Sequence, residues 1–211
     1  MDFDRSDHVC HLYEDPDEQR SATLEFIKDG LNRGERCVHV TSEPSVEEWY
    51  GYLEAAGIDV VSERQAGSLE VVRAADWYLE SDFQSVTMAR RYWQAIDRNS
   101  HGFSAIRMTA DMRWTSENVS VEALCHWEAT ADLVFEGEAA QVICQYDLSW
   151  HSSSEIRAAL RTHPVVVYEG RLRANPFFEA PAILANEPML NASKADAADI
   201  QAMLARLRES T

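Results

Sequence analysis

The chain has 211 residues, of which 45% are hydrophobic and 26% charged, a composition typical of a globular protein long enough to bury a full core. Its formal net charge is −17, and Lys28 and Lys194 are its only lysines, against seventeen arginines. Nucleic acid and anionic membranes are excluded as expected partners, because their phosphates would repel this surface. An acidic, lysine-poor surface suits a high-salt cytoplasm, although high-GC genomes also favour arginine over lysine.

The sequence predicts a cytoplasmic protein. No apolar run approaches the 18 residues of a membrane helix, and the first residues, MDFDRSDHVCHLYE, lack the basic and apolar regions of a signal peptide. The four cysteines, at positions 10, 37, 125 and 144, form no C-x-x-C pair. We therefore expect buried free thiols rather than a disulfide framework, and no cofactor.

Strand and helix signals alternate through the first half of the chain. Asp15, Pro16 and two further acids open a helix with an Asp cap and a proline at its first position, and Gly34 ends it. Ser45 and Glu48 form a capping box that opens another helix. The predicted elements are a strand at 9–13, a helix from 16 to Gly34, a strand at 36–41, a helix from 45 to 57, and short apolar runs at 58–61 and 69–72.

The second half centres on a β-α-β unit between Ala140 and Glu169. Gln141–Tyr146 is an apolar strand, Ser152 and Glu155 form a capping box, and a second strand covers Val165–Tyr168. The unit follows a helix predicted at 85–98, a strand at 103–108 and a helix at 121–134. This alternation predicts an α/β fold of three layers, with a largely parallel sheet and helices on both faces.

The composition changes near residue 186, so we expect a domain over residues 1–185 and a linker with an amphipathic helix over 186–211. Ser193 or Asp196 is expected to cap this last helix. Its apolar stripe consists of Ile200, Met203, Leu204 and Leu207. Such a helix docks either on its own domain or on a partner.

Several segments in this order resemble the MEDS sensory domain, named for methanogen and methylotroph proteins and the dichloromethane-responsive regulator. They are HVCHLYEDPDEQ, DGLNRGERCVHVTSE, GFSAIRMTADMRW, WEAT, ICQYD, THP and NPFFEAP, which together span about Asp7 to Pro181. The resemblance implies a fold derived from the RecA/KaiC-like ATPase core. It also implies sensing of small hydrocarbon-derived molecules, with a histidine kinase or a transcription regulator as signalling partner.

The residues themselves argue against ATP hydrolysis. A P-loop would carry G-x-x-x-x-G-K-[ST] after the first strand, but this chain has YEDPDEQR there, without glycine or lysine and with four carboxylates. The sequence also contains no kinase motif and no helix-turn-helix. We therefore expect a stand-alone, non-enzymatic module whose output lies in another chain.

Ligands of parallel sheets bind at the carboxyl ends of the strands, so we expect a binding site there. The candidate ligand-binding residues are His11, Tyr13, Arg107, Met112, Trp114, Glu128, Cys144, Tyr146 and His163. Trp114, Tyr146 and Met112 are expected to form walls, with Arg107 and His163 as polar anchors for a small, partly apolar ligand with one anionic end. The alternative is core packing, with Trp114 covering the core and Arg107 paired with Glu128.

The cysteines and histidines leave two further interpretations open. Cys10 and His11, with Cys144 or His163, could supply a soft metal site, although strand alternation puts Cys10 and His11 on opposite faces. Cys144 with His163 could also form a thiolate nucleophile, but no G-x-C-x-G elbow is present. No catalytic or metal-binding residue is therefore assigned.

Three hypotheses follow. The first is a sensory domain that binds a small organic molecule. The second is a protein-interaction module, with a homo-oligomer formed through the last helix as one form. The third is a metal or redox switch built on Cys10 and Cys144.

Overall fold

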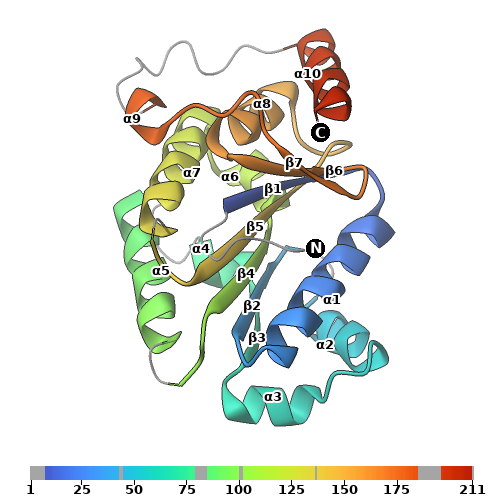
Figure 1. Ribbon diagram of the computed structural model, residues 1–211, viewed down its shortest axis with the longest axis vertical. Helices are drawn as coiled ribbons and strands as arrows, with labels where there is room; N and C mark the ends of the chain where they lie inside the picture. The colour runs from blue at the N-terminus through green and yellow to red at the C-terminus, as the bar shows by residue number, and fades with distance from the viewer. Residues whose placement is uncertain are drawn as a thin grey trace.

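A computed structural model describes residues 8–42, 45–78, 85–99, 102–135, 137–184 and 196–210. Its centre is a seven-stranded sheet in the order β3-β2-β4-β5-β1-β6-β7 (Figure 1). The strands are β1 (His8–Tyr13), β2 (Arg36–Thr41), β3 (Leu69–Arg73), β4 (Ile106–Asp111), β5 (Ala140–Asp147), β6 (Val165–Tyr168) and β7 (Arg171–Ala174). The predicted α/β fold with a largely parallel sheet is confirmed.

All neighbouring strands are parallel except β6 and β7, which are antiparallel at the edge. The first strand lies between the two strands of the predicted β-α-β unit, because β1 pairs with β5 on one side and with β6 on the other. Cys10 is thereby placed directly opposite Cys144 of β5. The N-terminal strand thus completes the centre of the sheet.

Helices cover both faces of the sheet and form the outer two layers (Figure 1). The helices are α1 (Pro16–Asn32), α2 (Val46–Ala55), α3 (Val60–Ala66), α4 (Ala74–Tyr78), α5 (Ser85–Asn99), the 3-10 turn η1 (Met112–Trp114), α6 (Thr115–Asn118), α7 (Val121–Phe135), α8 (Ser153–Thr162), α9 (Pro181–Leu184) and α10 (Ala197–Glu209). We call the face under α1 and α2 the α1 face, and the opposite one the α7 face.

The helix starts follow the signals in the sequence. Ser45 and Ser152 each accept a hydrogen bond from the backbone of the glutamate three residues later, and that glutamate bonds back to the cap, so both predicted capping boxes are confirmed. Asp196 caps α10 in the same way with Asp199, whereas Ser193, the other predicted cap, lies outside the described residues. These caps fix where the helices leave the sheet.

One predicted strand differs from the structure, and one apolar run takes a form that the sequence left open. The strand expected at 103–108 begins later, at Ile106, and continues to Asp111, because β2 pairs with it as far as Ala110 and β5 as far as Asp111. The apolar run at 58–61, for which no element type was predicted, contains the start of α3 at Val60. The side chain of Asp59 accepts a hydrogen bond from the backbone of Ser62 and thereby starts the helix.

The last helix docks on its own chain. Ile200, Leu204 and Leu207 of α10 are buried in the main core, and α10 contacts α8. The Arg208 guanidinium bonds to the Glu169 carboxylate and to the Tyr168 hydroxyl at the end of β6. The apolar stripe expected to dock on the domain or on a partner therefore contacts the domain. Among the described residues, no helix is long and apolar enough to span a membrane.

Candidate functional site

The alternation of side chains along the strands separates the predicted site residues into two groups. Even-numbered residues of β1 and β5, such as Cys10 and Cys144, enter the large core of the α7 face, whereas Val9 and Ile143 belong to a smaller cluster on the α1 face. His11 shares the α1 face with Val9, as the alternation of β1 requires. The prediction that Cys10 and His11 face opposite ways is confirmed, and His11 cannot join Cys144 in one metal site.

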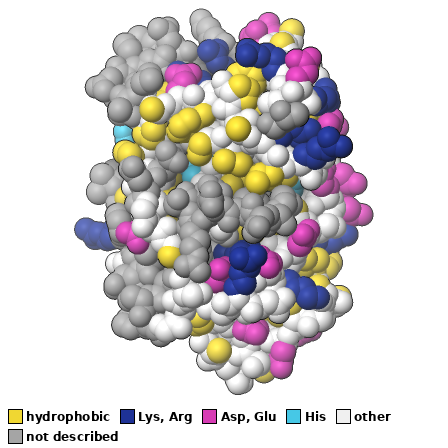
Figure 2. All heavy atoms as spheres, viewed as in Figure 1, with side chains coloured by type: hydrophobic (Ala, Val, Ile, Leu, Met, Phe, Trp, Pro, Cys, Tyr) yellow, Lys and Arg dark blue, Asp and Glu magenta, His cyan; other side chains and the backbone are white. Residues whose placement is uncertain are grey.

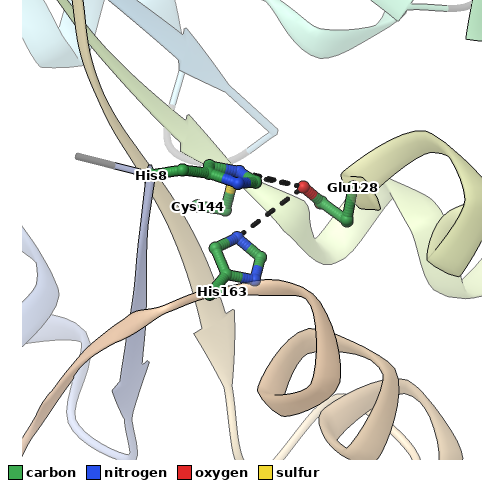
Figure 3. Close-up of side chains that lie close together, drawn as sticks. All are labelled: His8, Glu128, Cys144 and His163. Carbon is green, nitrogen blue, oxygen red and sulfur yellow. Dashed lines mark hydrogen bonds and ion pairs between the residues drawn. The ribbon is translucent and has the colours of Figure 1, made fainter. Parts of the chain in front are cut away.

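On the α7 face, four buried side chains converge: His8, Glu128, Cys144 and His163. They come from the start of β1, from α7, from β5 and from the residue that ends α8, and their side chains point toward one another (Figure 3). One potential ligand atom from each lies within 4.8 Å of the other three. We call these four residues the buried cluster.

The distances in the buried cluster are short. His8 Nε2 lies 3.3 Å from Glu128 Oε2, and His163 Nε2 lies 3.7 Å from the same oxygen. Cys144 Sγ lies 3.6 Å from His8 Nε2 and 3.7 Å from Glu128 Oε2. The other carboxylate oxygen, Oε1, accepts a hydrogen bond of 2.7 Å from the Tyr146 hydroxyl.

Burial controls the electrostatics of this region. It lowers the pKa of His8 and that of His163 to about 3, so both imidazoles are neutral near pH 7. It also raises the pKa of the Glu128 carboxyl, and, together with the nearby Glu128, it raises the pKa of the Cys144 thiol. The four residues offer two imidazoles, a thiol and a carboxylate, the groups that proteins use to bind borderline and soft metal ions.

The predicted ion pair between Arg107 and Glu128 is wrong. Arg107 lies on the α1 face, where its guanidinium bonds to Glu35 and lies 2.9 Å from an oxygen of Asp29. It also donates to the backbone oxygen of Phe26. Position 107 alternates with Ile106 and Met108, which pack in the core of the α7 face, so Arg107 and Glu128 are on opposite sides of the sheet.

The α1 face contains a cleft of about 440 Å³ between α1 and the centre of the sheet. It is lined by His11, Ala22, Glu25, Phe26, Lys28, Asp29, Asn32, Arg33, Arg107, Ile143 and Val167. Two of the predicted ligand-binding residues, His11 and Arg107, are among them. Phe26, Ile143 and Val167 form one apolar cluster and give the cleft an apolar surface, while α1 supplies charged side chains of both signs.

His11 is a polar group available in this cleft. It is 2% exposed, its Nε2 has no hydrogen-bond partner among the described residues, and the nearest carboxylate, that of Glu18, is 3.9 Å away. Figure 2 shows hydrophobic side chains gathered on the upper half of the visible face, with charged side chains along its border.

The remaining predicted residues do not form one pocket with Arg107 and His163. Met112 and Trp114 follow the carboxyl end of β4 and are buried, with Trp114 stacked on Tyr78 at 4.2 Å between ring centroids. Arg107 and His163 lie near the amino ends of β4 and β6, on different faces. Tyr13 lies beside His11, with 5.7 Å between ring centroids, but does not line the cleft.

Sequence reasoning missed His8 and most of the cleft. His8 precedes Cys10 by two residues, so extending the first strand by one residue would have placed both on the same face. On α1, the prediction gave the start and the end of the helix but not the stripe that faces the cleft. Ala22, Phe26, Asp29 and Arg33 recur at helical spacing and line the cleft.

Comparison with known families gives one match. The model of MEDS, the methanogen/methylotroph, DcmR sensory domain, matches residues 7–164, which include the whole buried cluster and all cleft residues except Val167. The segment NPFFEAP, which also resembles this family, lies beyond the matched residues. No curated protein matches the chain. Because the matched region covers most of its length, the chain belongs to the MEDS sensory-domain family.

Proposed function

We propose that this protein senses a small, uncharged organic molecule, of the hydrocarbon-derived kind, that binds in the cleft of the α1 face. The observation that carries the proposal is the cleft itself, in a sensory-domain family. The cleft combines an apolar surface with the Nε2 of His11, which makes no hydrogen bond within the described part of the chain. Small-molecule sites are typically concave and mainly apolar, with few polar groups that fix orientation.

The charges around the cleft favour a neutral ligand over the anionic one expected from the sequence. Glu35 and Asp29 already neutralise the Arg107 guanidinium, so an incoming carboxylate would have to displace one of them. Removing that partner would leave a carboxylate without its counterion in a partly buried place, which costs free energy. A hydroxyl, carbonyl or halogen substituent near His11 carries no such cost.

Binding is proposed to occur without catalysis. The thiol of Cys144 is fully buried and its pKa is raised by burial and by Glu128, so the thiolate needed for nucleophilic attack is disfavoured. His163, the other half of the predicted nucleophilic pair, is likewise enclosed in the α7 face. A ligand in the cleft is separated from both by the sheet.

The proposed signal is a displacement of α1. Helix α1 connects β1 to β2. A ligand that binds between α1 and Ile143 and displaces the helix would therefore also displace the ends of both strands. A ligand shifts the equilibrium only as far as it binds one arrangement better than the other. The proposed recipient is a histidine kinase or a transcription regulator.

The test is methyl NMR of the protein labelled at isoleucine and valine, titrated separately with dichloromethane, methanol, acetone and acetate. Saturable shifts are expected at Ile143 and Val167 with at least one neutral compound and weaker ones with acetate. Val166, which faces the opposite core, is the internal control. Shifts confined to the α7 face, or none with any neutral compound, would refute the proposal.

A matched pair of variants tests the location. Ala22 lines the cleft on α1, and the neighbouring Ser21 is exposed and does not line it. Ala22→Trp is expected to fill the cleft and reduce binding at least tenfold, whereas Ser21→Trp leaves it unchanged. Equal binding by both variants would place the ligand elsewhere.

A further inference from the structure

The buried cluster has the dimensions of a tetrahedral metal site. Zinc keeps its ligands at about 2.0–2.2 Å for nitrogen or oxygen and about 2.3 Å for sulfur, so neighbouring ligand atoms of a tetrahedron lie about 3.3–3.6 Å apart. The four distances given above, from 3.3 to 3.7 Å, match four of the six edges closely, and the other two separations are at most 4.8 Å. Hydrogen bonds alone do not require this, because 3.7 Å between a nitrogen and an oxygen is too long for one.

The orientation of His163 supports the same conclusion. Its Nδ1 lies 2.7 Å from the backbone oxygen of Ala159, which can only accept, so Nδ1 carries the hydrogen and donates it. In the neutral ring the lone pair is then on Nε2, which is fully buried and has no hydrogen-bond partner among the described residues. This lone pair faces the carboxylate of Glu128, which is unfavourable unless a proton or a cation lies between them.

The carboxylate is oriented in a comparable way. The Tyr146 hydroxyl donates to Oε1 of Glu128, which leaves Oε2 as the atom that faces both histidines and Cys144. A hydrogen bond between a ligand group and a neighbouring residue is typical of metal sites, where it fixes the orientation of the ligand. Here His163 donates such a bond to the backbone oxygen of Ala159, and Glu128 accepts one from the Tyr146 hydroxyl.

The charges also balance. Two neutral imidazoles, one thiolate and one carboxylate around a divalent ion sum to zero, so the filled site adds no net charge to the core. The same residues without a metal must bury either a carboxylate without a cationic partner or a protonated carboxyl. A divalent cation removes this cost.

We propose that His8, Glu128, Cys144 and His163 bind one zinc ion between the sheet and α7. The mixed nitrogen, sulfur and oxygen ligands in a tetrahedral arrangement suit zinc better than calcium or magnesium, which take oxygen ligands in larger numbers. All four positions are occupied by protein, as in structural zinc sites, so the ion ties β1, β5, α7 and the end of α8 together. Binding replaces the thiol proton, and the carboxyl proton where present, and releases them to solvent.

This inference does not depend on the small-molecule proposal, since the two sites lie on opposite faces of the sheet. Methyl shifts in the cleft test only the small-molecule proposal, and metal content tests only the buried cluster. Either can fail while the other holds.

The first experiment is metal analysis of the full chain, purified without chelator and, separately, unfolded with chelator and refolded with zinc. One zinc per chain is expected after refolding, with an unfolding temperature higher than that of the metal-free protein. After refolding with cobalt, the absorption spectrum should show the visible bands typical of tetrahedral coordination and a thiolate-to-cobalt charge-transfer band. Less than a tenth of an equivalent of metal in both preparations, or a cobalt spectrum without the thiolate band, would overturn the proposal.

Variants locate the ion. Cys144→Ser and Glu128→Gln nearly preserve side-chain volume and are each expected to lower zinc affinity at least a hundredfold. Cys37→Ser and His39→Gln are matched controls, because both positions are buried in the same sheet outside the cluster. Circular dichroism establishes which variants fold. If a variant does not fold, the cobalt spectrum of the unsubstituted protein tests whether Cys144 is a ligand. Wild-type affinity in a folded Cys144→Ser or Glu128→Gln variant contradicts the assignment.

Discussion

The two faces of the sheet differ in how completely helices cover the same central strands. On the α7 face, α7, α8 and α10 cover β1, β5 and β6, and the polar groups beneath them are fully buried. On the α1 face, α1 passes beside the same strands and leaves a cleft of about 440 Å³ above Ile143 and Val167. Polar groups are enclosed on one side of the sheet and accessible to a ligand on the other.

One position along a strand separates two kinds of chemistry. Ile143 contributes to the cleft, and Cys144 beside it contributes to the buried cluster. Since successive side chains of a strand point to opposite faces, β5 serves both sites without linking them directly. Communication between them would require movement of the strand itself.

The first prediction tests whether the α1 face is closed to water away from the cleft, where α2 covers β2. His39 of β2 is fully buried, contacts Thr109 and packs against Trp49 with 4.2 Å between ring centroids. Burial lowers its pKa to about 3, so the unfolded chain takes up a proton below about pH 6.5 that the native protein does not. Stability conferred by neutral His39 is thus complete above pH 6.5 and lost as the pH falls toward 3.

His39→Gln should remove this loss, which amounts to about 2 kcal/mol between pH 6.5 and pH 5 at about 1.4 kcal/mol per pH unit. Urea unfolding of the variant and the wild type at several pH values from 5 to 8 measures it. At pH 8 the two proteins should differ in free energy of unfolding only through the lost packing of His39, and this difference serves as the reference. Parallel stability curves for the two proteins would mean that His39 is reached by water.

A second prediction concerns the contact that bounds the cleft. Gly30 of α1 approaches β2 and β4 so closely that a Cβ would lie 2.6 Å from Cys37 Sγ and 2.7 Å from Arg107 Cδ. Gly30→Ala is therefore expected to destabilise the protein by about 1–3 kcal/mol, although alanine favours the helix by about 1 kcal/mol. Thermal or urea unfolding provides the value.

Gly51 in the middle of α2 is the matched control, because nothing lies within 4 Å of its Cβ position. Gly51→Ala should stabilise the protein by up to about 1 kcal/mol through helix propensity alone. A stabilising Gly30→Ala would show that α1 can move away from the sheet at little cost, and the cleft would then have no fixed width.

Local signals in the sequence predicted the elements well but not the sites. The capping boxes at Ser45 and Ser152 and the strand at Val165–Tyr168 depend on neighbouring residues and are confirmed. The position of β1 between β5 and β6 depends on pairing across more than 130 residues for the pair Cys10 and Cys144, which no local pattern specifies. The buried cluster, built on four separate elements, depends on that pairing. The predicted pair of Arg107 and Glu128 was wrong for another reason, because the two residues lie on opposite faces of the sheet.

The last prediction compares the two faces directly with one residue type on one strand. Val166 and Val167 are neighbours in β6, and both are nearly fully buried, at 0% and 2% exposure. Val166 packs in the closed core of the α7 face, whereas Val167 lines the cleft. Val166→Ala should cost about 2 kcal/mol, since the lost methyl groups leave a cavity that the core cannot fill.

Val167→Ala should cost less, about 1 kcal/mol, because the space it opens joins a cleft that solvent or ligand can enter. Urea unfolding measures both costs, and the methyl titration with the neutral compounds should change only for Val167→Ala. Equal costs for the two variants would mean that the α1 face is as closed as the α7 face. The ligand would then need an opening movement of α1 before it could bind, and association would be slower than for a preformed site.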